Sequence, residues 1–184
     1  MSSLGVWRRL MLAAPLGFAL MWGSAQAREI TAAERVDLNK AVEVFAAAMR
    51  AGDMQAIIDA IPPRILPSVA KSHGIDPAAL RLQMIEQFSQ AMKAVKIVSF
   101  KFDLSSAKFR ELPGGAPYAL IPTETVVDAG QGKVQVSSDT LALLEDGHWY
   151  LARVEQPGQV QMLTQAYPEF ASVTFGGATT KVVP

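Results

Sequence analysis

Residues 84–104 read MIEQFSQAMKAVKIVSFKFDL, and the spacing of their apolar side chains changes halfway through. Before Val95 the large apolar side chains recur every three or four residues, which is the period of one face of a helix. After it, Val98, Phe100 and Phe102 alternate with polar side chains, which predicts a strand with one solvated face. The segment therefore predicts a helix that leads directly into a strand.

Helices are predicted on the N-terminal side of this segment. Residues 31–34, Thr-Ala-Ala-Glu, form a capping box that begins a first helix, and Gly52 ends it. Asp53 caps a second helix, which Pro62-Pro63 interrupts or kinks. Asp76-Pro77 begins a third, because aspartate caps helices well and proline is accepted in their first turn.

Strands are predicted on the C-terminal side, separated by turns rich in glycine and proline. They cover residues 108–112, 118–128, 133–144 and 148–155. A short helix is expected over residues 160–167. Helices followed by meandering strands predict an α+β fold, in which N-terminal helices pack on a curved antiparallel sheet.

Two details of the expected sheet and core follow from single residues. Pro122 lies inside a strand and cannot donate to a ladder, so it predicts an edge strand or a bulge. The apolar positions change from even to odd within residues 133–144, which predicts a bulge near Ser138. The large aromatic residues on the periodic faces are expected to share one core: Phe45, Phe88, Phe100 and Phe102.

The first 27 residues predict a secretory signal peptide. Arg8 and Arg9 precede an apolar run that ends at Trp22 and is shorter than the ~20 residues of a membrane-spanning helix. Ala25-Gln26-Ala27 follows as a cleavage site. We expect a periplasmic protein, or alternatively a secreted one, with no stable membrane anchor after cleavage. Residues 28–184 then form a single domain, with a weakly patterned tail over about 168–184.

Composition argues against several function classes. The chain has no cysteine, which excludes disulfides, thiol catalysis and thiolate metal ligands. Without Arg8 and Arg9, 15 basic side chains face 17 acidic ones, a net charge of −2 that gives no electrostatic reason for nucleic-acid binding. The two histidines lack carboxylates at ligand spacing, and no phosphate-binding glycine motif is present. We therefore expect no cofactor, no metal and no nucleic-acid partner.

Two motifs resemble those of one superfamily. One is Met49-Arg50-Ala51-Gly52-Asp53 followed by Ala56-Ile57-Ile58, and the other is residues 145–151, EDGHWYL. With the element order, they resemble the nuclear-transport-factor-2-like superfamily, which includes SnoaL-like and ketosteroid-isomerase-like proteins. The resemblance implies a cone-shaped, cystatin-like fold, with a bent sheet around a long helix and an open pocket. Some members are isomerases, dehydratases or hydrolases, and many exported members are binding modules, so the fold alone does not give the function.

An isomerase of this kind would need a carboxylate in an apolar pocket and a hydrogen-bond donor facing it. Asp139 is the candidate base, because it lies in the middle of a strand next to the expected bulge. The alternative places Asp139 on the solvated face. Tyr118 and His148 are the candidate donors, although a histidine after a turn is more often exposed to solvent.

A binding site is expected between the third helix and the sheet. Its candidate ligand-binding side chains are Met84, Phe88, Tyr118, Trp149, Leu151 and Arg153. Arg153 shares a strand face with Trp149 and Leu151, so it could bind an anionic head group. Alternatively it forms an ion pair with Glu155 or Glu124.

Three functions follow from these candidates. The leading hypothesis is a non-catalytic periplasmic binding or accessory domain, with an apolar pocket for a small apolar or anionic ligand or for a partner protein. The first alternative is an isomerase or dehydratase of the ketosteroid-isomerase type. The second is a homodimeric envelope accessory protein that associates through its sheet.

The mature protein is predicted to begin at Arg28, because cleavage follows Ala25-Gln26-Ala27. Mass spectrometry of material from the compartment outside the inner membrane should find this N-terminus. Peptides that retain Trp22 would contradict the assignment.

Overall fold

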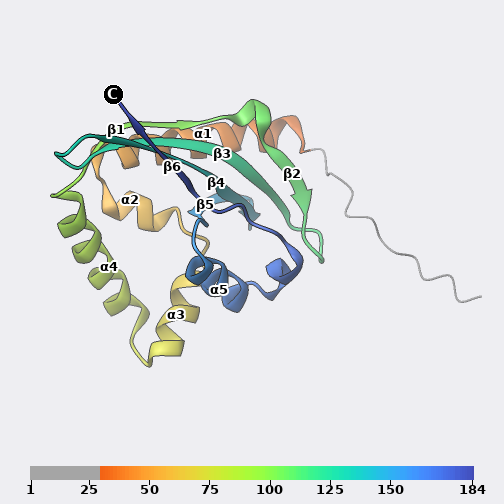
Figure 1. The fold of residues 1–184 in the computed structure, drawn as a ribbon. Helices are drawn as coiled ribbons and strands as arrows, with labels where there is room; N and C mark the ends of the chain where they lie inside the picture. The colour runs from red at the N-terminus through yellow and green to blue at the C-terminus, as the bar shows by residue number, and fades with distance from the viewer. Residues whose placement is uncertain (1–29) are drawn as a thin grey trace, which may run out of the picture.

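The computed structural model describes residues 30–184, in which four α-helices precede the first strand (Figure 1). They are α1 (Ala32–Ala51), α2 (Met54–Asp59), α3 (Ile65–His73) and α4 (Pro77–Met92). The predicted signal peptide and the predicted N-terminus at Arg28 lie outside the described residues.

The predicted helix starts are confirmed by their hydrogen bonds. Thr31 Oγ1 accepts the backbone N–H of Glu34 at 3.2 Å, and the Thr31 N–H donates to Glu34 Oε2 at 2.8 Å. Gly52 ends α1 with a φ of 67°, a left-handed conformation that glycine adopts without strain. Asp53 caps α2 and Asp76 caps α4 through their side-chain oxygens.

The rest of the described chain forms an antiparallel sheet and three short helical elements. The strands are β1 (Lys96–Phe102), β2 (Lys108–Glu111), β3 (Pro117–Asp128), β4 (Lys133–Glu145), β5 (His148–Arg153) and β6 (Thr179–Val183). The helical elements are η1 (Leu104–Ser106), α5 (Pro157–Ala166) and η2 (Pro168–Ser172). The predicted α+β class is confirmed: N-terminal helices contact a strongly curled, half-barrel sheet (Figure 1).

Two long strands form the middle of this sheet, and each has two partners on its outer side. The strand order is β1-β3-β4-β5, with β2 also paired to β3 and β6 also paired to β4. Pro122 lies where the partner of β3 changes from β2 to β1, so the predicted edge strand or bulge at Pro122 was wrong. Its carbonyl accepts the Asp103 N–H at 2.8 Å, so its missing N–H faces a gap between two strands.

The bulge predicted near Ser138 was also wrong. The register between β3 and β4 is unbroken from Tyr118 and Leu143 to Asp128 and Lys133. The apolar positions of β4 change from even to odd residue numbers because both faces of the sheet are covered where β4 pairs with β5. The bulge lies in β1 instead, between Ile97 and Ser99, and it leaves Val98 46% exposed.

The two covered faces make two clusters of buried side chains. On the α1 face, Phe45 packs against Phe100 and Phe102, with ring centroids 6.0 and 6.1 Å apart. On the other face, α5 and η2 cover a cluster of nine side chains: Leu112, Tyr118, Leu120, Leu141, Leu143, Val154, Leu163, Tyr167 and Phe170. Phe88 belongs to neither cluster and is 45% exposed, so its predicted place in the phenylalanine core was wrong.

Phe45→Ala should lower the free energy of unfolding by about 3–5 kcal/mol, because it removes a buried ring from three-way aromatic packing. Phe88→Ala is the matched control, and we expect a loss below about 1 kcal/mol because its ring is half exposed. Urea denaturation of the two variants measures the difference. Equal losses would contradict this placement of the core.

Candidate functional site

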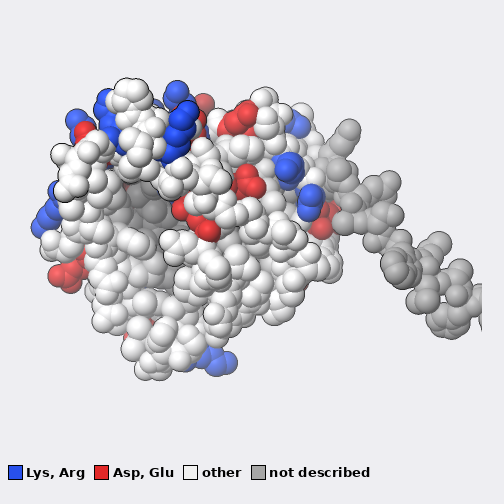
Figure 2. Space-filling view, viewed as in Figure 1, with Lys and Arg blue, Asp and Glu red and all other residues white. Residues whose placement is uncertain are grey.

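An apolar cavity of about 360 Å³ lies beside the edge of β5 that faces away from β4. The four helices α2 to α5 surround it, together with the end of α1. The recess between α4 and α5 is visible in the space-filling view (Figure 2). Its volume falls within the range of about 300–1,000 Å³ that is typical of small-molecule sites.

Helix α4 forms one wall of the cavity. Leu80, Met84, Phe88 and Met92 recur every fourth residue and therefore lie along one face of the helix, and all four line the cavity. The main contacts of α4 are with α2 and α3 rather than with the sheet, and none of its side chains is fully buried. Its apolar stripe thus faces the cavity. Leu82, on another side of the helix, is 66% exposed.

The other walls are also apolar. Helices α2 and α3 and the turn between them contribute Met54, Ile57, Ile61, Ile65, Leu66 and Val69. Helix α1 contributes Phe45 and Met49, the β5 side contributes Leu151, Ala152 and Val154, and α5 contributes Met162 and Leu163. Five of the lining side chains are methionines, whose unbranched, flexible side chains adapt to irregular contacts.

Two polar side chains, Arg153 and Gln159, also line the cavity. The Arg153 guanidinium forms an ion pair with Glu155, which also accepts the hydroxyl of Ser138 at 2.7 Å. Gln159 Oε1 accepts the backbone N–H groups of Glu155 and Gln156 at 2.8 and 3.0 Å. Arg153 Nε is buried and has no hydrogen-bond partner in the described part of the chain.

Four of the six predicted ligand-binding residues line this cavity: Met84, Phe88, Leu151 and Arg153. Trp149 lies outside it, under α1, where its indole N–H donates to the Glu34 carbonyl at 2.9 Å. Tyr118 also lies outside it, on the opposite face of the sheet, with its ring 5.2 Å from that of Phe170. Arg153 has Glu155 as its ion-pair partner, one of the two carboxylates considered from the sequence.

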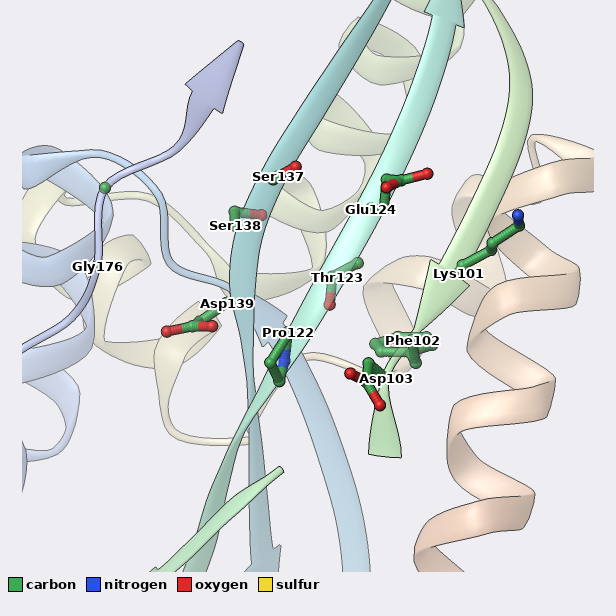
Figure 3. A pocket seen from close by; sticks show the side chains of 11 residues that line it. Lys101, Phe102, Asp103, Pro122, Thr123, Glu124, Ser137, Ser138, Asp139 and Gly176 are labelled. Atoms are coloured by element: carbon green, nitrogen blue, oxygen red, sulfur yellow. The ribbon is translucent and has the colours of Figure 1, made fainter. Parts of the chain in front are cut away.

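The candidate base Asp139 lies in a different place, a polar depression of about 690 Å³ on the sheet. It points toward Gly176, whereas Lys101 and Glu124 point to the other side of the depression (Figure 3). His148 is exposed, with Nδ1 2.9 Å from the Asp146 carbonyl oxygen. The three candidate catalytic residues Asp139, Tyr118 and His148 therefore do not converge on the apolar cavity.

The sequence reasoning missed the wall made by residues 57–69. Ile57, Ile61, Ile65 and Val69 recur every fourth residue, which is the spacing of one helix face. Pro62-Pro63 in the middle of this stretch obscured the pattern, because it ends one helix before the next begins. The polar pair Glu155 and Gln159 lay beyond the expected site, around the start of α5.

A buried tyrosine, Tyr167, connects the start of α3 to the end of α5. Tyr167 donates its hydroxyl to Glu145 Oε2 at 2.6 Å and accepts the backbone N–H of Arg64 at 3.2 Å. The Arg64 guanidinium lies over the tyrosine ring, 3.7 Å from its centroid, and pairs with Glu145 and Glu169. Burial, together with the hydrogen bond to Glu145, raises the pKa of Tyr167 to about 12.

Comparison with known proteins found no match, whether among family models, curated proteins or solved structures. None of the helices in residues 30–184 has both the length and the apolar character that crossing a membrane requires. Within the same residues, no three histidine or carboxylate side chains are grouped so as to hold a metal ion.

Replacing Tyr167 should change the alkaline stability of the protein. The folded-state pKa is raised from 10.0 to about 12, so its stabilising effect is complete below pH 10 and is lost as pH rises toward 12. Tyr167→Phe should cost about 1–3 kcal/mol below pH 10, because it leaves the buried partners of the hydroxyl unsatisfied. Urea denaturation between pH 8 and pH 12 should show this difference shrinking above about pH 10. A difference that stays constant up to pH 12 would be incompatible with the hydrogen bonds described.

Proposed function

We propose that this protein is an exported, non-catalytic binding domain that holds a small apolar ligand in the cavity between α4, α5 and β5. The predicted signal peptide supports a periplasmic location, with secretion as the alternative. The cavity itself is the observation that carries the proposal, because its walls are apolar on every side except at Arg153 and Gln159.

The energetic reason is the unfilled apolar surface. Apolar side chains gain about 25 cal/mol for each Å² that leaves water, and the stripe of α4 and the isoleucines of α2 and α3 face open space instead of one another. A ligand that covers these apolar side chains removes them from water, and binding gains this free energy while the protein stays folded. Among residues 30–184 the lining contains no carboxylate, which favours binding over proton transfer as the role of this cavity.

We also infer a relationship to the nuclear-transport-factor-2-like superfamily. Its support is the order of elements, with helices before a strongly curled antiparallel sheet, and the two motifs at residues 49–58 and 145–151. A pocket between the helices and the sheet fits the cone that this resemblance implies.

The uncharged fluorescent dye N-phenyl-1-naphthylamine tests the proposed function, because its emission rises when it enters an apolar site. The purified protein should bind it saturably. Met84→Glu should weaken binding by about tenfold or more, since it places a carboxylate inside the apolar cavity.

Leu82→Glu is the matched control, because Leu82 lies on the same helix but outside the cavity and is largely exposed. It should leave dye binding unchanged, and circular dichroism should show both variants folded. If the protein binds no dye, or if the two variants lose binding equally, the cavity is not the binding site.

A further inference from the structure

The chemistry of the cavity walls restricts the ligand further, on the basis of the proposed binding function. Met49, Met54, Met84, Met92 and Met162 come from four different helices and surround the same space. Each side chain has three rotatable bonds and adapts its shape, so these walls can pack against a flexible chain whether it is bent or extended.

The volume of the cavity also favours an alkyl chain. About 360 Å³ lies near the lower limit of the range for small-molecule sites. This space suits one alkyl chain. It suits neither the two chains of a phospholipid nor a helix of a partner protein.

The polar end of the cavity determines which head group the chain carries. The charge of Arg153 is already balanced by Glu155, which also holds Ser138. A second carboxylate at this end would meet the negative charge of Glu155 at short range, and like charges in a partly buried site disfavour one another. An anionic head group is therefore disfavoured.

Hydrogen-bond donors remain at the same end. Gln159 uses its oxygen to accept two backbone N–H groups, so its amide nitrogen is the group it offers to a ligand. The Arg153 side chain lines the cavity and is 22% exposed, and its guanidinium has more N–H groups than its contacts with Glu155 and Ser138 use. Two donors next to a neutralised charge favour an uncharged acceptor oxygen.

We propose that the cavity binds the single alkyl chain of an uncharged amphiphile, whose ester, amide or hydroxyl oxygen accepts hydrogen bonds from Arg153 and Gln159. Monoacylglycerols and fatty alcohols have this chemistry, and free fatty acids do not. The surface around α3 and α5 carries few charged side chains in the space-filling view, which agrees with an uncharged ligand (Figure 2).

Displacement of N-phenyl-1-naphthylamine from the purified protein tests the chain. Monoacylglycerols of roughly 8 to 16 carbons should bind about fourfold more tightly for each added methylene, until the cavity is full. Affinity should then level off. If the dye binds but affinity does not depend on chain length, the alkyl-chain inference is overturned while the proposed binding function stands; if the dye does not bind, the proposed function itself fails.

A comparison at equal chain length tests the head group. Near neutral pH, the ionised fatty acid should bind about tenfold more weakly than the monoacylglycerol. Glu155→Gln removes the competing charge, so it should strengthen fatty-acid binding by about tenfold and change monoacylglycerol binding little.

Glu124→Gln is the control for this variant, because Glu124 lies on β3 outside the cavity and bonds Gln135. It should change neither affinity. Equal binding of the two ligands to the unmodified protein, or an unchanged ratio in Glu155→Gln, would overturn the assignment of an uncharged head group. Retained monoacylglycerol binding shows that the Glu155→Gln protein is folded.

Discussion

The hydrogen bond from the Leu151 N–H to the Ala60 carbonyl, at 2.7 Å, joins the helical half of the protein to the edge of its sheet. β5 is the edge strand at one end of the order β1-β3-β4-β5, and without a partner its outer backbone groups would be open to another chain. The end of α2 covers this edge at one residue rather than along its whole length. Pro62-Pro63 follow immediately and turn the chain away, so α3 and α4 extend beyond the sheet instead of packing on it. The apolar cavity is the space that this arrangement encloses.

The two faces of the sheet are covered by different elements. At the end where β4 pairs with β5, α1 covers one face and α5 with η2 cover the other, so apolar side chains are buried on both faces there. Toward the other end the outer face carries polar side chains such as Glu124 and Asp139. Thr123 and Thr140 are buried on the α1 face, where their hydroxyl oxygens lie 2.8 Å apart and satisfy each other. The candidate base is thereby kept on the outer face, away from the apolar walls.

Much of the fold could be predicted from local patterns. The capping residues Thr31, Asp53 and Asp76 specify helix starts through their own short-range hydrogen bonds, and the alternation at Phe100 and Phe102 specifies a strand. The errors arose where long-range pairing decides the outcome. Pro122 is tolerated in a central strand only because β1 and β2 share one side of β3, and no local pattern contains that information.

The candidate site was predictable only in part, for the same reason. Met84 and Phe88 were identified from a helical stripe, but whether such a stripe packs on a sheet or faces a cavity depends on where the chain turns after α2. Phe88 was accordingly placed in the core as well as in the site. Trp149 and Leu151 lie on one face of β5, yet α1 covers the tryptophan whereas the cavity reaches the leucine.

Helix α4 shows how stability and binding are connected in this architecture. It contributes no fully buried side chain, and it is held by the Asp76 cap, by the ion pair of Arg81 with Asp59 and by its contacts with α2 and α3. An element with few buried apolar contacts opens at a lower free energy than the rest of a domain. The apolar side chains of α4 that are not fully buried are also those that a ligand in the cavity would cover. By mass action, any ligand that binds the closed form alone must stabilise α4 in proportion to the logarithm of its concentration. The lack of fully buried side chains on this helix is therefore a direct consequence of the open cavity, and a ligand in the cavity would bury them.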